Sequence, residues 1–150
     1  MNSRRIVDLS PEIVVGLQPL HTVPQKVEAT VHSKPIPPGT HWQGTSISIY
    51  THTGAHIDAL IHVRAGGWAT EKISLDQVVG DGMVLDFSYK KGSEPIDVSE
   101  LSRYDSSIRP GDILLLRTDW SDKYYGKPEF FSDSPYVTKE GAEWLADRRP

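Results

Sequence analysis

The segment from Thr51 to His62, THTGAHIDALIH, limits what this chain can fold into more than any other stretch. His52, His56, Asp58 and His62 fall within eleven residues of it, although the whole chain of 150 residues contains only six histidines. Titratable side chains are costly to bury without partners, and these interrupt an otherwise apolar run. Chance rarely gathers half of a chain's histidines beside an aspartate in this way. We therefore expect these side chains to form a functional site rather than to be scattered surface histidines.

Neither a regular helix nor a straight strand brings these side chains together. On a helix, Asp58 would point about 160° away from His56. On a strand they share a face, but His52 and His56 would lie about 13 Å apart, too far for one metal ion with bonds of about 2 Å. Gly54 is the residue best able to take unusual backbone angles, so we expect a bend there. The bend would let His52 converge with His56 and Asp58 as a ligand set for Zn²⁺, Mn²⁺ or Fe²⁺.

Composition restricts the function classes. The chain has no cysteine, which excludes disulfides, thiol nucleophiles and cysteine zinc sites, so imidazole and carboxylate must supply any metal ligands. The net charge of −4 and the absence of a longer cationic run than Arg4–Arg5 or Arg148–Arg149 argue against nucleic acid as a partner. No apolar run approaches the roughly 20 residues that a membrane span requires. We expect one soluble, cytoplasmic domain over residues 1–150.

Strand and helix signals alternate along the chain. Apolar runs and alternating patterns predict strands over residues 5–10, 28–33, 44–51, 83–88 and 112–118, the last fully buried. Capping residues predict helix starts at Ser74, Asp97 and Thr138. The apolar stripe of the last helix is predicted as Ala142, Leu145 and Ala146. This mixture favours an α/β or α+β class with a mixed sheet. A strand is expected after such a last helix, so we expect the chain to be incomplete at its C-terminal end.

The run from His52 to His62 resembles the H-x-G-T-H-x-D-x-P-x-H signature of the cyclase family of metal-dependent hydrolases, which includes bacterial kynurenine formamidase and isatin hydrolase. Similar stretches are DLSP near the start, GDILLLRTDW at residues 111–120 and EGAEWLADR at residues 140–148. The resemblance therefore covers nearly the whole chain. It implies a single α/β domain with a mixed sheet in a β/β/α layered, swivelling-domain-like arrangement.

The resemblance implies a role for each member of the cluster. His52, His56 and Asp58 would bind a divalent metal, Zn²⁺ or Mn²⁺, and His62 would act beside it as an acid/base group. Family members carry a further His and Glu in a later segment that help to hold a second metal, and nothing in this chain matches them. We therefore expect at most one tightly bound ion.

Two positions depart from the family signature. Ala55 replaces the usual threonine, and Leu60 replaces the usual proline, which bears on the spacing between Asp58 and His62. Trp42 and Trp68 lie on either side of the cluster in the sequence, which suggests aromatic contacts to a substrate. Ordinary packing explains them equally well.

The remaining histidines have no spacing that suggests a shared ligand. His21, His32 and His41 are therefore expected to be surface or hydrogen-bonded residues.

The favoured hypothesis is a hydrolase that uses metal-activated water on a formyl or cyclic amide, of arylformamidase or isatin hydrolase type. Its substrate would be a small molecule with a C–N bond other than a peptide bond. The same site could serve a lactone hydrolase, a cyclase or a dehydratase. A shortened chain could also be a non-catalytic metal-binding or assembly module. The resemblance further implies a homo-oligomer, either a dimer or a tetramer. From the charge and the hydropathy we expect no nucleic-acid or membrane partner.

Overall fold

The computed structural model describes residues 5–18, 25–36 and 40–150. The chain divides into two compact units, Met1–His56 and Ile57–Pro150. Within the described residues, no helix is long and apolar enough to cross a lipid bilayer. The expectation of one domain over the whole chain stays a prediction.

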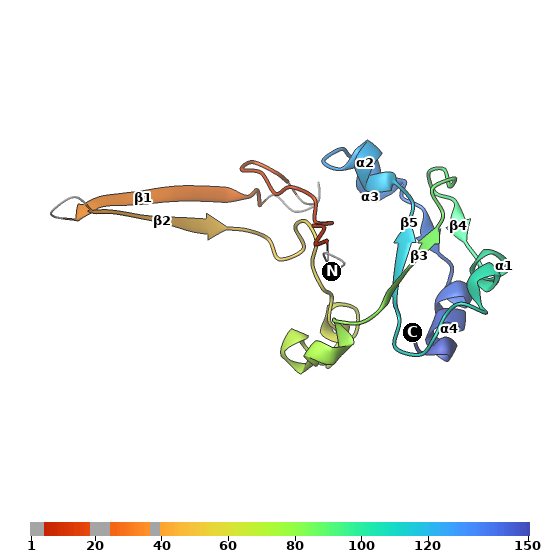
Figure 1. The fold of residues 1–150 in the computed structure, drawn as a ribbon. Helices are drawn as coiled ribbons and strands as arrows, with labels where there is room; N and C mark the ends of the chain where they lie inside the picture. Colours follow the sequence, from red (N-terminus) through yellow and green to blue (C-terminus); the bar gives the residue numbers. More distant parts are fainter. Residues whose placement is uncertain (1–4, 19–24, 37–39) are drawn as a thin grey trace. The chain divides into compact units, whose positions relative to one another are not determined.

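The first unit is built around an antiparallel hairpin of β1 (Glu28–Ile36) and β2 (Thr40–Ser48) (Figure 1). The register pairs Val31 with Thr45, and such β-branched residues favour extended backbone. The strands predicted over residues 28–33 and 44–51 are both present. The second ends at Ser48, three residues earlier than its alternating pattern suggests.

The strand predicted over residues 5–10 is wrong. These residues have no regular structure, and the side chains of Ile6 and Leu9 are exposed. A strand requires a neighbouring strand for its hydrogen bonds, and none of the described strands pairs with this segment. The backbone hydrogen bonds in this part of the first unit are made by residues 16–17, which pair with Val27. The side chain of Val27 is buried.

The second unit mixes short strands with short helices, which confirms the predicted class. Its strands are β3 (Gly82–Asp86), β4 (Pro95–Ile96), β5 (Ile113–Arg117) and β6 (Tyr136–Val137). Its α-helices are α1 (Val98–Leu101), α2 (Trp120–Tyr124), α3 (Glu129–Ser132) and α4 (Lys139–Arg148). Its 3-10 helices are η1 (Leu60–His62), η2 (Thr70–Lys72), η3 (Leu75–Gln77) and η4 (Ser102–Tyr104). Two small parallel sheets pair β3 with β5 and β4 with β6.

The predicted helix caps are present. Ser74 and Gln77 form a reciprocal capping box, although the helix that they begin is the 3-10 helix η3. Asp97 begins α1, where its carboxylate accepts the backbone N–H of Glu100 at 3.1 Å. Thr138 begins α4, where its hydroxyl oxygen accepts the backbone N–H of Gly141 at 3.0 Å. Each cap satisfies a backbone donor that the first turn of a helix leaves without a partner.

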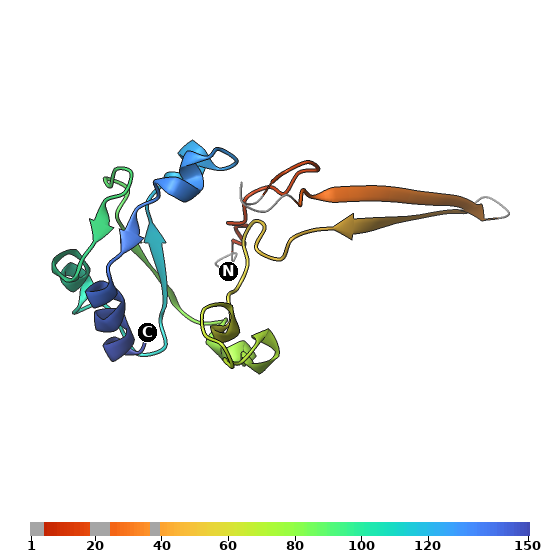
Figure 2. The ribbon, with the colours of Figure 1, turned by 180° about the vertical axis from the view of Figure 1, so that it is seen from behind.

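The core of the second unit lies between its two sheets and two of its helices. Leu85, Phe87, Ile96 and Leu101 are almost completely buried there, and Trp144 and Leu145 of α4 pack against them. Figure 2 shows α1 and α4 beside the small sheet of β4 and β6. Burying each such apolar side chain contributes about 1.5–3 kcal/mol to folding.

The face that α4 turns toward the core differs from the predicted stripe. Ala142 and Ala146 are exposed, and Gly141 is buried next to Leu145. A Cβ at Gly141 would lie 3.1 Å from the carbonyl oxygen of Ile96 and from two neighbouring side chains. The helix therefore comes closest to the strands at Gly141. The spacing and hydrophobicity of its residues alone do not predict this close approach.

The prediction that residues 112–118 form a fully buried strand is also partly wrong. The strand is present as β5, but Leu115 and Arg117 are exposed while Leu114 and Leu116 pack near the core. In a two-stranded sheet only one face meets the core, so successive side chains alternate between burial and exposure.

Candidate metal centre

The loop after β2 carries the predicted bend. Gly54 has a φ of 69°, the left-handed conformation that glycine adopts without steric cost. Just before it, Thr53 is buried, and its hydroxyl donates a hydrogen bond of 2.6 Å to the carbonyl oxygen of Tyr50. This bond ties the turn back to the residue that leaves the hairpin. His52 is therefore enclosed in a short, internally bonded loop.

The bend brings two imidazoles face to edge. Nδ1 of His52 and Nε2 of His56 lie 3.2 Å apart, and the ring planes are at 89°. Two nitrogens bound at about 2.0–2.1 Å to one ion in tetrahedral geometry would lie about 3.3 Å apart. The observed separation therefore suits two ligands of a single ion.

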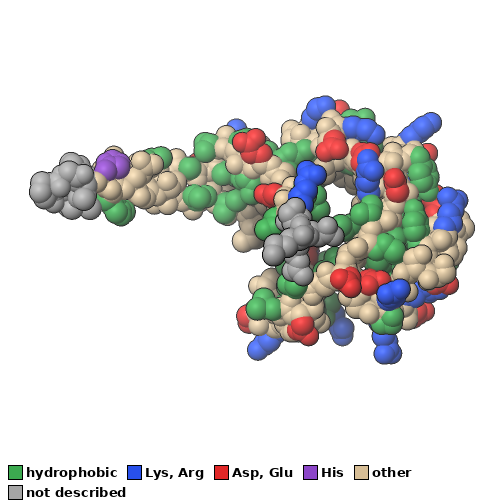
Figure 3. Space-filling model, viewed as in Figure 1, with side chains coloured by type: hydrophobic (Ala, Val, Ile, Leu, Met, Phe, Trp, Pro, Cys, Tyr) green, Lys and Arg blue, Asp and Glu red, His purple; other side chains and the backbone are tan. Residues whose placement is uncertain are grey.

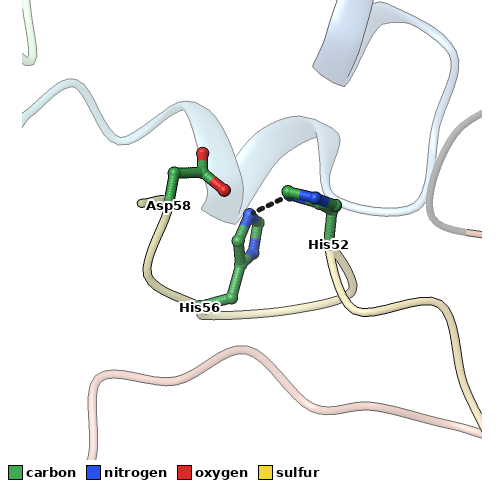
Figure 4. Close-up of side chains that lie close together, drawn as sticks. All are labelled: His52, His56 and Asp58. Atoms are coloured by element: carbon green, nitrogen blue, oxygen red, sulfur yellow. Dashed lines mark hydrogen bonds between the residues drawn. The ribbon is translucent and has the colours of Figure 1, made fainter. Parts of the chain in front are cut away.

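Asp58 completes a three-residue group with the two histidines (Figure 4). One ligand atom from each of the three residues lies within 4.8 Å of the others. His52 is half-buried, whereas His56 and Asp58 are exposed. Two imidazoles and one carboxylate are a donor set suited to Zn²⁺, Mn²⁺ or Fe²⁺, so the residues present fit a divalent ion. Exposure on one side would leave coordination positions accessible to water or a substrate.

The backbone determines which nitrogen of His56 faces the group. Nδ1 of His56 lies 2.9 Å from the carbonyl oxygen of Gly54. A carbonyl oxygen only accepts, so Nδ1 carries the proton in this contact. In the neutral ring, Nε2 then presents its lone pair toward His52 and Asp58. This is the usual way in which a partner outside the ligand set orients a metal-binding histidine.

His62 lies outside the three-residue group. It is the last residue of η1, and its backbone N–H bonds the carbonyl oxygen of Ala59 at 2.9 Å. Its side chain is exposed. The acid/base role of His62 stays a prediction.

The two tryptophans occupy different surroundings. Trp42 is half-exposed on β2 and packs over Gly44; six residues of strand, or roughly 20 Å, separate it from Ser48. Trp42 is therefore far from the end of β2 that leads to His52. Trp68 is also half-exposed, but its carbonyl oxygen accepts the N–H of Ile61 within the turn that ends in His62. Substrate contacts by either residue stay predictions.

The other histidines fit the expected surface role where they are described. Nε2 of His32 lies 2.9 Å from the hydroxyl of Ser46 across the hairpin, and His41 is exposed. His21 lies outside the described residues.

Sequence reasoning missed the supporting residues of the loop. Thr53 supplies a buried hydroxyl, and Tyr50 supplies both the accepting carbonyl and a ring whose centre is 5.3 Å from that of His52. The only signal in the sequence is a threonine between the first ligand and the glycine of the bend. Such a position is compatible with a side-chain bond back to the preceding turn.

The chain matches known proteins over most of its length. Residues 7–150 match the sequence model of a family described as "Putative cyclase". Kynurenine formamidase of Salinibacter ruber is 46% identical over 41 residues, which are 27% of this chain and 19% of that protein. Kynurenine formamidase of Erythrobacter litoralis is 31% identical over 100 residues, which are 67% of this chain and 42% of that protein.

A solved structure supports the fold. It is described as a potential metal-dependent hydrolase with cyclase activity, and it aligns with a TM-score of 0.68 at 24% identity. The alignment covers 95% of this chain and 63% of that one. The matches thus span less than half of the length of both curated relatives and under two thirds of the solved structure.

Proposed function

Because the chain belongs to the cyclase family, as its His/Asp signature predicts, we propose that it is a metal-dependent hydrolase of formyl or cyclic amides. The observation that carries this proposal is the convergence of His52, His56 and Asp58 within one loop. Zn²⁺ and Mn²⁺ are the proposed ions, because imidazole and carboxylate donors suit both. One ion per chain is the proposed stoichiometry.

Each residue of the group has a chemical role in this proposal. When bound, a divalent ion supplies a Lewis acid that polarises a carbonyl and lowers the pKa of water. The carboxylate of Asp58 offsets part of the positive charge, and the two imidazoles hold the ion without adding charge. His62 is exposed four residues after Asp58, and its ring can give a proton to the leaving nitrogen.

The substrate class rests on the relatives. The two curated proteins that match are kynurenine formamidases, which supports an aryl formamide as substrate. A cyclic amide of the isatin type and a lactone would present a similar carbonyl to the same donor set. Ring opening of a lactone therefore remains the alternative within this proposal.

A substrate panel tests the proposal. Purified chain is loaded with Zn²⁺ or Mn²⁺ and assayed with an aryl formamide, an isatin-like lactam and an aliphatic lactone, with His56→Ala as the matched control. We expect turnover of the formamide or the lactam that is lost in the control. No turnover of any amide by fully loaded protein, or equal turnover by the control, would reject the proposal.

We propose also that the chain forms a homo-oligomer. The side chains of Val31 and Ile47 are 61% and 65% exposed, and the register places them on the same face of the hairpin. Figure 3 shows hydrophobic side chains on the visible surface of the hairpin. Because a two-stranded hairpin is marginally stable in water by itself, a covering partner would stabilise it. A dimer or tetramer in the cytoplasm, with one domain per chain, completes the proposal.

A further inference from the structure

The side chain of Thr53 differs from its neighbours in the metal-binding loop. It is only 4% exposed, whereas Thr51, Ala55 and His56 are exposed. Its hydroxyl donates to the carbonyl oxygen of Tyr50 at 2.6 Å. A buried hydroxyl without such a partner would be costly, so this bond both satisfies the group and fixes its rotamer.

The bond encloses His52. The bonded carbonyl belongs to Tyr50 and the bonded hydroxyl to Thr53. His52 lies between these two residues, so its backbone is part of a segment that is held at both ends. The Tyr50 ring lies beside that of His52, with 5.3 Å between ring centres and 43° between planes. These contacts fix both the backbone that carries His52 and the space open to its ring.

The two histidines are therefore held by different means. His56 is oriented by a backbone carbonyl, that of Gly54, which no substitution of a side chain removes. His52 is held through the hydroxyl of Thr53, which a single substitution removes. The contribution of Thr53 can thus be separated experimentally from that of the ligands.

We propose that Thr53 is a positioning residue for His52 in metal binding. This inference rests on the proposed metal site. Without the hydroxyl, the segment carrying His52 gains freedom, and that freedom must be lost again when an ion binds. Partners outside the ligand set typically change metal affinity by about 10- to 100-fold. Because Thr53 acts through the backbone rather than on the ring, we expect a change of about tenfold.

The experiment compares three variants of the full chain. Thr53→Val removes the hydroxyl and keeps the shape, Thr53→Ser keeps the hydroxyl, and Thr51→Val makes the same change at an exposed neighbour. The dissociation constant for Zn²⁺ is measured by competition with a chromophoric chelator, and the thermal midpoint of each metal-free protein is measured alongside. We expect about tenfold weaker binding for Thr53→Val, and values close to wild type for the other two variants.

Other results would overturn the inference. Unchanged Zn²⁺ affinity in Thr53→Val with a lower metal-free midpoint would assign Thr53 to folding alone. Equal weakening by Thr51→Val would show a general effect of the loop. If Thr53→Val does not fold, Thr53→Ala replaces it, and equal affinities of the alanine and serine variants would be contrary to the inference.

Zn²⁺ binding by the wild-type chain distinguishes a failure of the proposed metal site from a failure of the role of Thr53. Absence of stoichiometric Zn²⁺ binding by wild-type protein would reject the metal site itself. Binding by wild type that is abolished in His56→Ala but unaffected in Thr53→Val would keep the site and reject the role of Thr53.

Discussion

Replacing Gly67 with alanine tests whether the position of His62 matters for catalysis. A Cβ at Gly67 would lie 2.7 Å from the backbone nitrogen of Ile61 and 2.7 Å from the carbonyl carbon of Leu60. Both atoms belong to the turn that ends in His62, so no side-chain rotation relieves the contact. Ordinary contact begins at 3.4 Å, so the two segments must separate by about 0.7 Å.

The size of the effect follows from this displacement. Overpacking costs about 1–3 kcal/mol, and the lower entropy of the unfolded chain returns about 0.4–1 kcal/mol, so we expect a net loss of about 1–2 kcal/mol. The shift also strains the bond from Ile61 N to Trp68 O, which is 3.0 Å long. A catalytic group misplaced by about 1 Å can cost about 100-fold in rate. We expect Gly67→Ala to lower kcat about 10- to 100-fold at unchanged metal content.

Gly66→Ala is the matched control. Gly66 has a φ of 76° and no neighbouring atom within 4 Å of an added Cβ. Alanine at this position would have to adopt the left-handed backbone conformation, which costs about 1–2 kcal/mol, but its Cβ would not displace the turn that ends in His62. The assays are urea unfolding, elemental analysis and kcat for both variants, with His62→Ala as the reference, expected to lose about 10²- to 10⁴-fold. Equal kcat in the two glycine variants, or a wild-type kcat in Gly67→Ala despite lower stability, would refute the reasoning.

Three further results are expected. His56→Ala should leave too few ligands for tight chelation, so elemental analysis should find no stoichiometric metal; an unchanged metal content would remove His56 from the ligand set. Burial raises the pKa of Glu100, but its 2.6 Å ion pair with Lys90 and other hydrogen bonds outweigh this and hold the pKa below its usual value of 4.5. The ionised Glu100 should therefore stabilise the fold at pH values above 4.5, and this stabilisation should be lost as the pH falls through its lowered pKa. Glu100→Gln should lower the thermal midpoint at pH 7 and weaken its dependence on acid, and an unaltered midpoint at pH 7 would contradict this. Ile47→Glu, placed on the exposed face that it shares with Val31, should shift sedimentation toward a monomer, and an unshifted oligomer would place the contact elsewhere.

The convergence of His52, His56 and Asp58 could be predicted because it depends on local geometry. The spacing of His52, His56 and Asp58 admits one metal only if the chain bends between them, and Gly54 is where a bend is least costly. The helix starts at Asp97 and Thr138 were predictable for the same reason, since a cap bonds a backbone N–H only a few residues away.

The features that sequence reasoning missed depend on what lies opposite a residue. The buried face of α4 follows from the close approach of Gly141 to Ile96, a residue 45 positions earlier in the sequence. The segment that contains Ile6 and Leu9 has the composition of a strand, but a strand also requires backbone hydrogen bonds to a neighbouring strand. The burial of Thr53 likewise depends on the packing of the loop, and its sequence neighbours do not determine it.

The short contact between His52 and His56 has a consequence for how the loop behaves before an ion arrives. With both rings neutral and the Nδ1 proton of His56 given to Gly54, the proton between the two rings belongs to Nδ1 of His52. That proton would keep the nitrogens near the separation that a metal requires. Coordination of an ion through the same nitrogen would require the neutral His52 ring to carry its proton on Nε2 instead. The change of tautomer would move a proton within one ring, so metal binding should require little rearrangement of the loop.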